Sequence, residues 1–251
     1  PQLLPALDSD AVSVLKDDTE RLGIHVHTGV AVNSIESRGD AFVVHAVIDD
    51  QPVELHADRV VNGAGRVANV DTLNLDAANI AHHGVRIDVN DHLQSVSNPR
   101  VWVVGDALTG APQLSPLATY EGTIVGRNIV EDARLAPDYR VNPSAVYTVP
   151  ALATVGLTEA AARDAGLEVD VTVNDMREWF SGKSYAESVA WAKVIVNRAD
   201  DTIVGAHLVG HHGEELIHVF SLAMEHNITA SALRASRFAF PTFSSDIKNL
   251  L

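Results

Sequence analysis

Apolar residues within residues 8–22 recur on one face of a helical period, which is typical of an amphipathic helix. Asp8 is a helix-capping residue at the start of this segment, and Gly23 is a terminating residue directly after it. Residues 24–28 then predict a short strand. A helix, a glycine and a strand in this order predict half of a βαβ unit.

The stretch from residue 30 to residue 61 has the pattern of a β-meander. Ala41–Val47 and Val53–Ala57 are strand-like, and the acidic, proline-containing residues 49–52 between them have the composition of a turn. Arg59–Asn62 predicts a further strand that leads into a glycine-containing loop.

A second apolar run predicts a buried strand at Val101–Val104, which stops at Gly105 and Asp106. A glycine- and proline-containing loop follows, and a helix is predicted from near Pro116 to about Asp132. The pattern therefore places Asp106 at the end of a strand and facing a helix N-terminus, which is where ligands bind in many α/β proteins.

The pattern changes around residues 137–143, where we expect a domain boundary. We divide the chain into a partial nucleotide-binding domain (1–62), a central segment (63–143) and a C-terminal domain (144–251). In the C-terminal domain, residues 193–197 and 203–208 predict a hairpin. Three helices are predicted there, at 159–165, 213–226 and 230–235.

Composition narrows the class of protein. Hydrophobic residues make up 46% and charged residues 20% of the 251 residues, as in globular proteins, and no apolar run approaches the length that spans a bilayer. The formal net charge is −15, which disfavours binding to nucleic acid or to an anionic membrane. We expect a cytoplasmic protein.

The sequence contains no cysteine, so this chain forms no disulfide, offers no thiolate to a metal and performs no thiol–disulfide step. Its first residue is Pro1 and the βαβ pattern is half complete. We therefore expect the chain to be the C-terminal part of a longer parent.

Two motifs carry the candidate chemistry. Gly63–Asn69 reads Gly-Ala-Gly-Arg-Val-Ala-Asn, and Val104-Gly105-Asp106 is followed by Leu114-Ser115-Pro116 and Glu121-Gly122. Together they resemble the FAD-binding core of the pyridine nucleotide–disulfide oxidoreductases, the family of glutathione reductase, dihydrolipoamide dehydrogenase and mercuric reductase. Ala64 and Ala68 depart from the Thr and Pro of the family's T-G-R-x-P-N signature.

The resemblance implies that Asp106 holds the ribityl chain of FAD and that Leu114 and Ser115 meet the pyrimidine edge of the flavin. Physical chemistry agrees, because a carboxylate accepts hydrogen bonds from hydroxyls and helix N-terminal N–H groups stabilise negative charge. The complete set of cofactor residues that we expect is Gly65, Arg66, Gly105, Asp106, Gln113, Leu114 and Ser115. We expect no catalytic residue in this chain.

Three further segments extend the resemblance over essentially the whole chain: Leu3–Asp8, Tyr147–Glu159 and Val204–Gly210. It implies a mixed α/β and α+β fold, with the remnant of a βαβ/β-meander NAD(P) domain, an FAD-contacting segment and an α+β dimerisation domain. It also implies a homodimer through residues 144–251, with electrons passing from NAD(P)H through FAD to a small-molecule acceptor.

The C-terminal motif departs from the family. Where thiol-handling members carry His-Pro-Thr-x-x-Glu, this chain reads Phe240-Pro241-Thr242-Phe243-Ser244-Ser245-Asp246. Phenylalanine transfers no proton. We expect Asp246 to have nothing to orient, and Phe240–Pro241 to form a structural turn with a cis bond.

The chain also lacks the G-x-G-x-x-G turns for FAD and NAD(P)H and the C-x-x-x-x-C disulfide of the family. We therefore predict that the chain alone is inactive and binds FAD weakly or not at all. The alternative is a short non-catalytic dimerisation or ligand-binding module.

Two clusters favour ordinary structural roles. We expect no metal at the histidines and glutamates near the start of a predicted helix, which are His211, His212, Glu214, Glu215 and His218. Core or interface packing is the expected role of the aromatic residues Trp179, Phe180, Tyr185 and Trp191.

Overall fold

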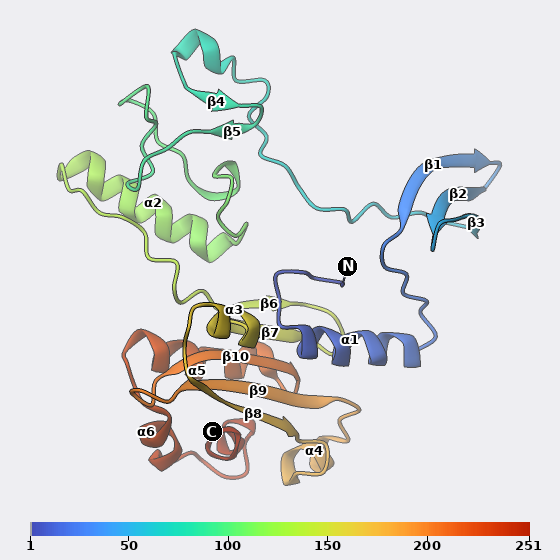
Figure 1. The fold of residues 1–251 in the computed structure, drawn as a ribbon, viewed down its shortest axis with the longest axis vertical. Coiled ribbons are helices and arrows are strands. Elements are labelled where there is room, and N and C mark those ends of the chain that lie inside the picture. The colour runs from blue at the N-terminus through green and yellow to red at the C-terminus, as the bar shows by residue number, and fades with distance from the viewer. Residues whose placement is uncertain (1) are drawn as a thin grey trace. The chain divides into compact units, whose positions relative to one another are not determined.

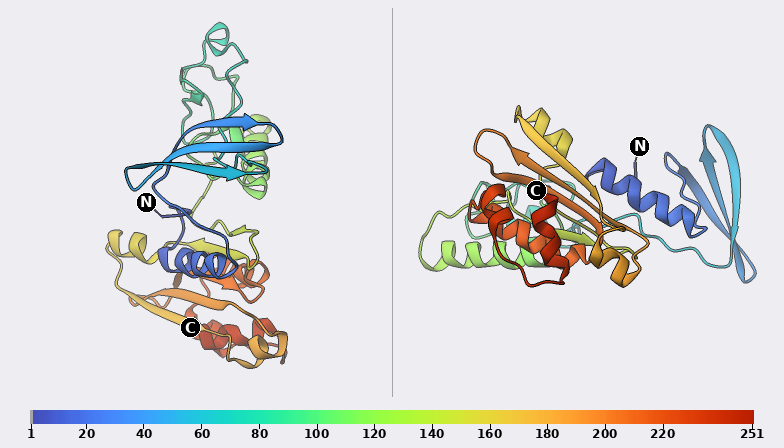
Figure 2. Two further views of the ribbon diagram at one scale, coloured as in Figure 1. Left: turned by 90° about the vertical axis from the view of Figure 1, so that its right-hand side faces the viewer. Right: turned by 90° about the horizontal axis from the view of Figure 1, so that it is seen from below.

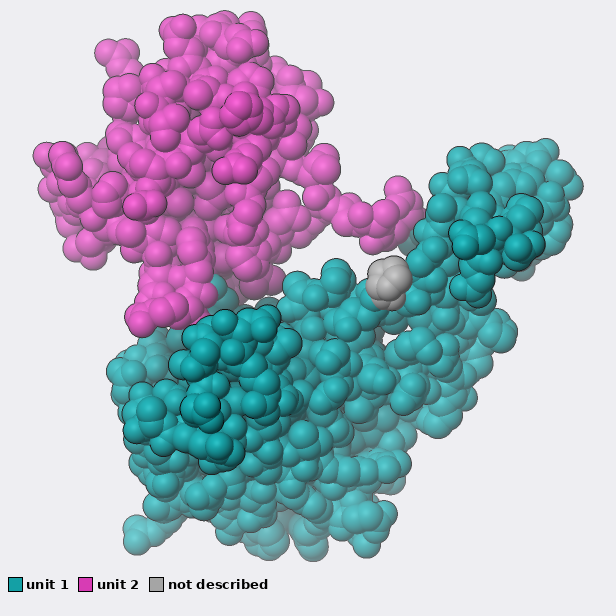
Figure 3. Space-filling model, viewed as in Figure 1, with its two compact units in different colours: residues 1–61, 141–251 teal, residues 62–140 magenta. Residues whose placement is uncertain are grey.

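A computed structural model describes residues 2–251. The chain divides into two compact units, one formed by residues 1–61 with 141–251 and the other by residues 62–140 (Figure 3). Along the described part of the chain, none of the helices combines the length and the apolar composition needed to cross a membrane.

The first helix, α1 (Ser9–Arg21), forms as the sequence predicts. The side chain of Asp8 accepts hydrogen bonds from the backbone N–H groups of Asp10 and Ala11, which satisfies two of the free donors at the helix start. Gly23 follows the helix with φ +86°, a conformation that glycine adopts without strain.

A three-stranded antiparallel meander follows, formed by β1 (Ala31–Arg38), β2 (Ala41–Ile48) and β3 (Gln51–Ala57) in that order. The predictions for the second and third strands are confirmed. The predictions of strands at residues 24–28 and 59–62 are wrong. A strand needs a hydrogen-bonded neighbour, and within residues 2–251 neither segment has one.

The second unit contains short elements around its own apolar core. They are η1 (Leu75–Ala78), β4 (His82–His83), β5 (Arg86–Ile87), η2 (Gly105–Ala107) and α2 (Ser115–Val130). The helix predicted from near Pro116 is confirmed. Val101–Val104 is buried only in part and forms no sheet strand; its one ladder contact is an isolated bridge between Gln94 and Trp102.

The rest of the first unit is a five-stranded antiparallel sheet with the order β6-β7-β10-β9-β8 (Figure 1). Its strands are β6 (Ser144–Val146), β7 (Leu152–Gly156), β8 (Val169–Asp175), β9 (Ala190–Asn197) and β10 (Ile203–Gly210). The predicted hairpin between β9 and β10 is confirmed.

Helices cover both faces of this sheet (Figure 2). Besides α1, the helical elements of this part of the chain are α3 (Glu159–Asp164), α4 (Phe180–Tyr185), α5 (Gly213–Glu225), α6 (Ala230–Ala235), η3 (Phe243–Asp246) and α7 (Ile247–Leu250). Leu152 and Val209 pack against α1, whereas their neighbours Ala153 and Leu208 face the core that α5, α6 and α7 complete. This alternation of side chains is the period-two pattern of a sheet buried on both sides.

Candidate functional site

The glycine-containing loop at residues 63–69 has the backbone freedom that its sequence predicts. Gly65 has φ +92°, and no atom lies within 4 Å of the position that a Cβ would occupy there. The backbone N–H of Ala64 donates to the Asn62 side chain at 3.1 Å. The loop therefore presents Arg66 from a turn whose conformation favours glycine.

The second motif forms a tight turn. Gly105 has φ +62°, and a Cβ at this position would lie 3.0 Å from the Cβ of Ala118. Glycine is thus favoured both by the left-handed backbone and by the close approach of α2. The turn leaves the side chain of Asp106 outside the core, with 48% of its surface exposed.

The structure brings the predicted residues of these two motifs together. The guanidinium of Arg66 lies 3.2 Å from a carboxylate oxygen of Asp106 and donates to the backbone carbonyl of Gln113 at 3.4 Å. The Gln113 side chain donates in turn to the backbone carbonyl of Asp106 at 3.4 Å. Arg66 therefore joins the first motif to the second, through the Asp106 carboxylate and through the Gln113 carbonyl 47 residues along the chain.

Leu114 and Ser115 stand at the beginning of α2. Leu114 is the N-cap, and it has no side-chain capping bond. Because the first N–H groups of a helix have no partner within the helix, this end is a donor site with partial positive charge. A hydroxyl-rich chain beside Asp106 and an electron-rich ring edge beside Ser115 fit these acceptors and donors.

Glu121 belongs to the second motif but is not among the cofactor residues expected from the sequence. It lies on α2, is 1% exposed, and accepts a hydrogen bond from the backbone N–H of Gly105 at 2.5 Å. The O–H of Tyr139 donates to its second carboxylate oxygen at 2.9 Å. The sequence does contain a signal for this role: Glu121 falls on the buried face of a predicted helix, and a buried carboxylate needs specific hydrogen-bond partners.

The C-terminal motif contains a correction. Asp246 does have a group to orient: its carboxylate lies 2.8 Å from Nε2 of His211 and accepts a hydrogen bond from Ser181. Nδ1 of His211 lies 2.6 Å from the carboxylate of Glu187. Sequence spacing could not show this, because His211 precedes Asp246 by 35 residues. The predicted cis bond between Phe240 and Pro241 is confirmed.

His211 is buried, and each of its ring nitrogens faces a carboxylate. The ring therefore links the two carboxylates through its two nitrogens. Within the described residues, no group of three or more such side chains is arranged to hold a metal ion.

A second buried ion cluster lies between α1, α3 and β9. The ammonium of Lys193, 2% exposed, lies 3.2 Å from Asp8, 2.7 Å from Asp10 and 2.9 Å from Glu159. Burial lowers the pKa of Lys193, but the hydrogen bonds to Asp10 and Glu159 and the charge of Asp8 raise it more, so it lies above its ordinary value.

Asp8, the most deeply buried acid of this cluster, has a pKa shifted in the opposite direction. Burial raises the pKa of Asp8, but neighbouring His207 and Lys193 lower it more, so it lies below its ordinary value. Burial lowers the pKa of His207. Nε2 of His207 lies 3.1 Å from the carbonyl of Leu157 and therefore carries the proton, while Nδ1 accepts from Thr154 at 2.6 Å.

The predicted aromatic cluster is dispersed. Trp179 packs against the main core of the first unit and Trp191 against the cluster formed with α1. Phe180 and Tyr185 are 58% and 67% exposed. The ring of Phe180 lies 5.4 Å from that of Phe240, the residue at the position of the family's histidine.

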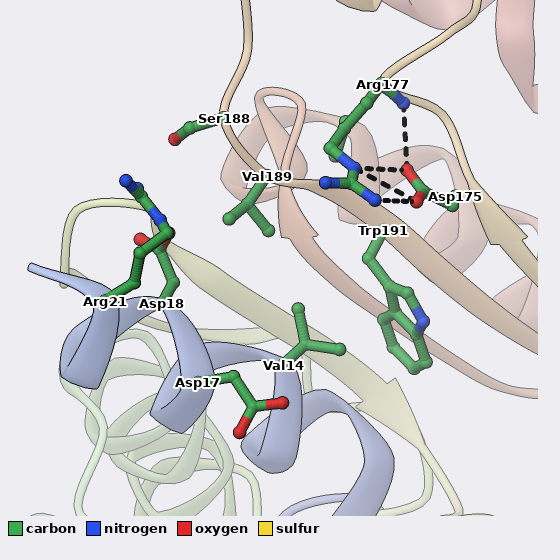
Figure 4. Close-up of a pocket in the computed structure, with 10 residues that line it drawn as sticks. Val14, Asp17, Asp18, Arg21, Asp175, Arg177, Ser188, Val189 and Trp191 are labelled. Carbon is green, nitrogen blue, oxygen red and sulfur yellow. Dashed lines mark hydrogen bonds and ion pairs between the residues drawn. The ribbon is translucent and has the colours of Figure 1, made fainter.

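A pocket of about 490 Å³ in the first unit lies between α1 and strands β8 and β9 (Figure 4). Val14 and Trp191 contribute its apolar lining. Arg21 pairs with Asp18 at 2.6 Å, and Arg177 pairs with Asp175 at 2.5 Å. Because these arginines already have carboxylate partners, we assign no ligand to the pocket.

Comparisons with known proteins give a consistent result. Residues 142–251 match the family model described as the pyridine nucleotide-disulphide oxidoreductase dimerisation domain, and residues 1–122 match the model of the pyridine nucleotide-disulphide oxidoreductases.

Curated relatives include a mercuric reductase from Staphylococcus aureus, 29% identical over 98% of this chain, and a dihydrolipoyl dehydrogenase from Mycobacterium leprae, 29% identical over 99% of it. The chain spans 45% and 53% of the length of these two proteins. An uncharacterised 19.7 kDa protein of a mercuric resistance operon in S. aureus is 38% identical over 180 residues, which cover that protein completely.

Among solved structures, the HOCl-induced flavoprotein disulfide reductase RclA from Escherichia coli superposes with a TM-score of 0.88 at 22% identity. The match covers 98% of this chain and 56% of that chain. LpdA from Mycobacterium tuberculosis gives a TM-score of 0.85 at 20% identity. These likenesses confirm the predicted mixed α/β and α+β fold.

Proposed function

This chain belongs to the pyridine nucleotide-disulphide oxidoreductase family, and we propose that it is the C-terminal, flavin-contacting and dimerising part of an FAD-dependent NAD(P)H oxidoreductase. The observation that carries the proposal is the convergence of Arg66, Asp106 and Gln113 beside the start of α2. The predicted domains (1–62, 63–143 and 144–251) are part of this proposal, as is a cytoplasmic location.

The residues of this site have distinct tasks. The Asp106 carboxylate accepts hydrogen bonds from ribityl hydroxyls, and Arg66 holds that carboxylate in place through their ion pair. Gly65 and Gly105 allow the backbone to approach, and Leu114 and Ser115 meet the pyrimidine edge, where the N–H of Ser115 at the start of α2 stabilises negative charge. FAD, when bound, accepts a hydride from NAD(P)H and passes electrons to the acceptor.

The acceptor is a small molecule other than a glutathione- or lipoamide-type disulfide. Phe240 occupies the position at which the resemblance places the acid–base histidine, and it has no proton to give. His211 does not replace that group, because it is buried and engaged by Glu187 and Asp246. Reduction of the acceptor thus proceeds without a proton from this position.

We expect the product of the complete reading frame that contains this chain to purify with visible flavin absorbance. In that protein, Asp106→Ala is expected to weaken FAD binding by about 1.5–3 kcal/mol, because a hydrogen bond to a charged group is lost. Calorimetric titration of the apoprotein with FAD measures this. Exposed Asp91 gives the control, since Asp91→Ala removes the same charge elsewhere in the unit.

The chain of residues 1–251 alone is expected to bind FAD weakly or not at all and to be inactive. A complete product without flavin, or equal FAD affinities of the Asp106 and Asp91 variants, would contradict the proposed function. A colourless complete product that is still dimeric would favour the alternative of a short non-catalytic module.

We further propose a homodimer through residues 144–251. This segment carries large exposed apolar side chains, among them Tyr147 (85%), Val149 (90%) and Phe240 (71%), and dimer interfaces are enriched in such groups. Phe240→Glu is expected to shift the chain toward monomer in light scattering. Val130→Glu, on an exposed position of α2, should leave the mass unchanged. A wild-type monomer at high concentration would refute the dimer.

A further inference from the structure

The turn that presents Asp106 is held from behind by a buried carboxylate. One oxygen of Glu121 accepts the Gly105 N–H, and the other accepts the O–H of Tyr139. Because Glu121 is 1% exposed, these donors compensate a charge that water does not reach. The position of the carboxylate is therefore set by Gly105 on one side and by Tyr139 on the other.

Tyr139 belongs to the last residues of the second unit, which ends at Arg140. The O–H of Tyr120, on α2, accepts the N–H of Asp138 at 2.9 Å, so two tyrosines tie this segment to the helix. Of these two tyrosines, Tyr139 is the one whose hydroxyl donates to Glu121. Burial and the neighbouring Glu121 raise the pKa of Tyr139 above its ordinary value, so its O–H remains a donor throughout the neutral range.

The Gly105 N–H also determines where Asp106 points. Glu121 accepts the Gly105 N–H, and Asp106 is the next residue in the chain, so this hydrogen bond anchors the turn that carries Asp106. Loss of the Glu121 contact leaves a backbone donor without its partner and frees one constraint on the peptide that precedes the Asp106 side chain.

We propose that Tyr139, Glu121 and Gly105 form a relay that couples the segment entering the dimerisation domain to the orientation of the Asp106 carboxylate. Glu121 is thus a positioning residue of the flavin site. This inference rests on the proposed function for its flavin partner, but the relay itself is a property of the protein without cofactor. Movement of the segment at Tyr139 changes the acceptor available to Gly105 and so the presentation of Asp106.

The relay is tested by NMR on the chain of residues 1–251 without flavin. We expect Tyr139→Phe to shift the Gly105 and Asp106 amide signals and to increase hydrogen exchange at Gly105 about tenfold. Tyr185→Phe is the control, because it removes the hydroxyl of a tyrosine that is 67% exposed and belongs to the first unit, so it should leave both signals in place.

Glu121→Gln keeps an acceptor for Gly105 and a polar partner for Tyr139, so it should restore most of the protection that Glu121→Leu removes. Equal effects of the two tyrosine variants on Gly105, or equal exchange in the Gln and Leu variants, would overturn the relay. FAD titration of the complete protein is a separate measurement. Absence of flavin there, with an intact relay in the NMR data, would reject the proposed function alone.

Discussion

Replacing Lys193 by methionine is expected to lower the free energy of unfolding by about 3–5 kcal/mol, because it leaves a buried carboxylate without its cation. Asp8 is 3% exposed and keeps its backbone donors, but it loses the ammonium that lies 3.2 Å away. Asp10 and Glu159 are more exposed, so we expect their lost ion pairs to contribute less to the fall in unfolding free energy. Denaturant unfolding at neutral pH measures the change.

The pH dependence identifies the cause. The folded pKa of Asp8 is depressed, so its contribution to stability is present above its unfolded pKa and is lost as the pH falls through the folded value. The folded pKa of Lys193 is raised, so its contribution is present below its unfolded pKa and is lost only as the pH rises through the folded value. The difference between wild type and Lys193→Met should therefore shrink below about pH 4.

Lys16→Met is the matched control, because Lys16 makes an exposed ion pair with Glu20 on the same helix. Its effect should stay within about 0.5 kcal/mol. Adding Asp8→Asn to Lys193→Met should recover part of the loss, since no charge is then stranded at residue 8. A loss that is constant from pH 3 to pH 8 would indicate a packing defect instead and would refute the ionic explanation.

His211→Leu is expected to cost about 3 kcal/mol of unfolding free energy. The substitution removes both nitrogens from between Glu187 and Asp246 and leaves two largely buried carboxylates without that partner. Because Asp246 belongs to η3, the C-terminal segment should loosen first. Denaturant unfolding gives the global change, and hydrogen exchange at residues 240–251 gives the local one.

His212 provides a close control for this experiment. His211 and His212 have φ +57° and +52°, so a leucine costs a similar amount of backbone strain at either position. His212 is about half exposed, its ring contacts that of Phe243 at a tilt, and its acidic neighbour Glu214, 4.0 Å away, is 31% exposed. His212→Leu should therefore cost no more than about 1 kcal/mol. Equal losses in the two variants would mean that backbone conformation, not the acid pair, explains the effect.

Signals within a few residues of sequence were sufficient to predict the helices, whose hydrogen bonds and caps are local. Asp8 and Gly23 delimit α1, Thr158 caps α3, and the apolar period of α5 identifies its buried face. The same approach failed for residues 24–28 and 59–62. Their composition is that of strands, but a strand forms only beside a partner, and the presence of that partner is not a local property. Residues 101–104 do have a partner, but they pair with it through a single bridge and form no sheet.

The candidate site divides in the same way. The motifs identify Asp106, Arg66 and Gly105 by residue type and order, because backbone approach, charge and helix start are encoded within a few positions. The tertiary structure alone decides which distant carboxylates become partners: Glu121 with Gly105, Asp246 with His211, and Asp8 with Lys193, across 16, 35 and 185 residues. Burial makes each of these pairings necessary, and burial is a consequence of how the whole chain packs.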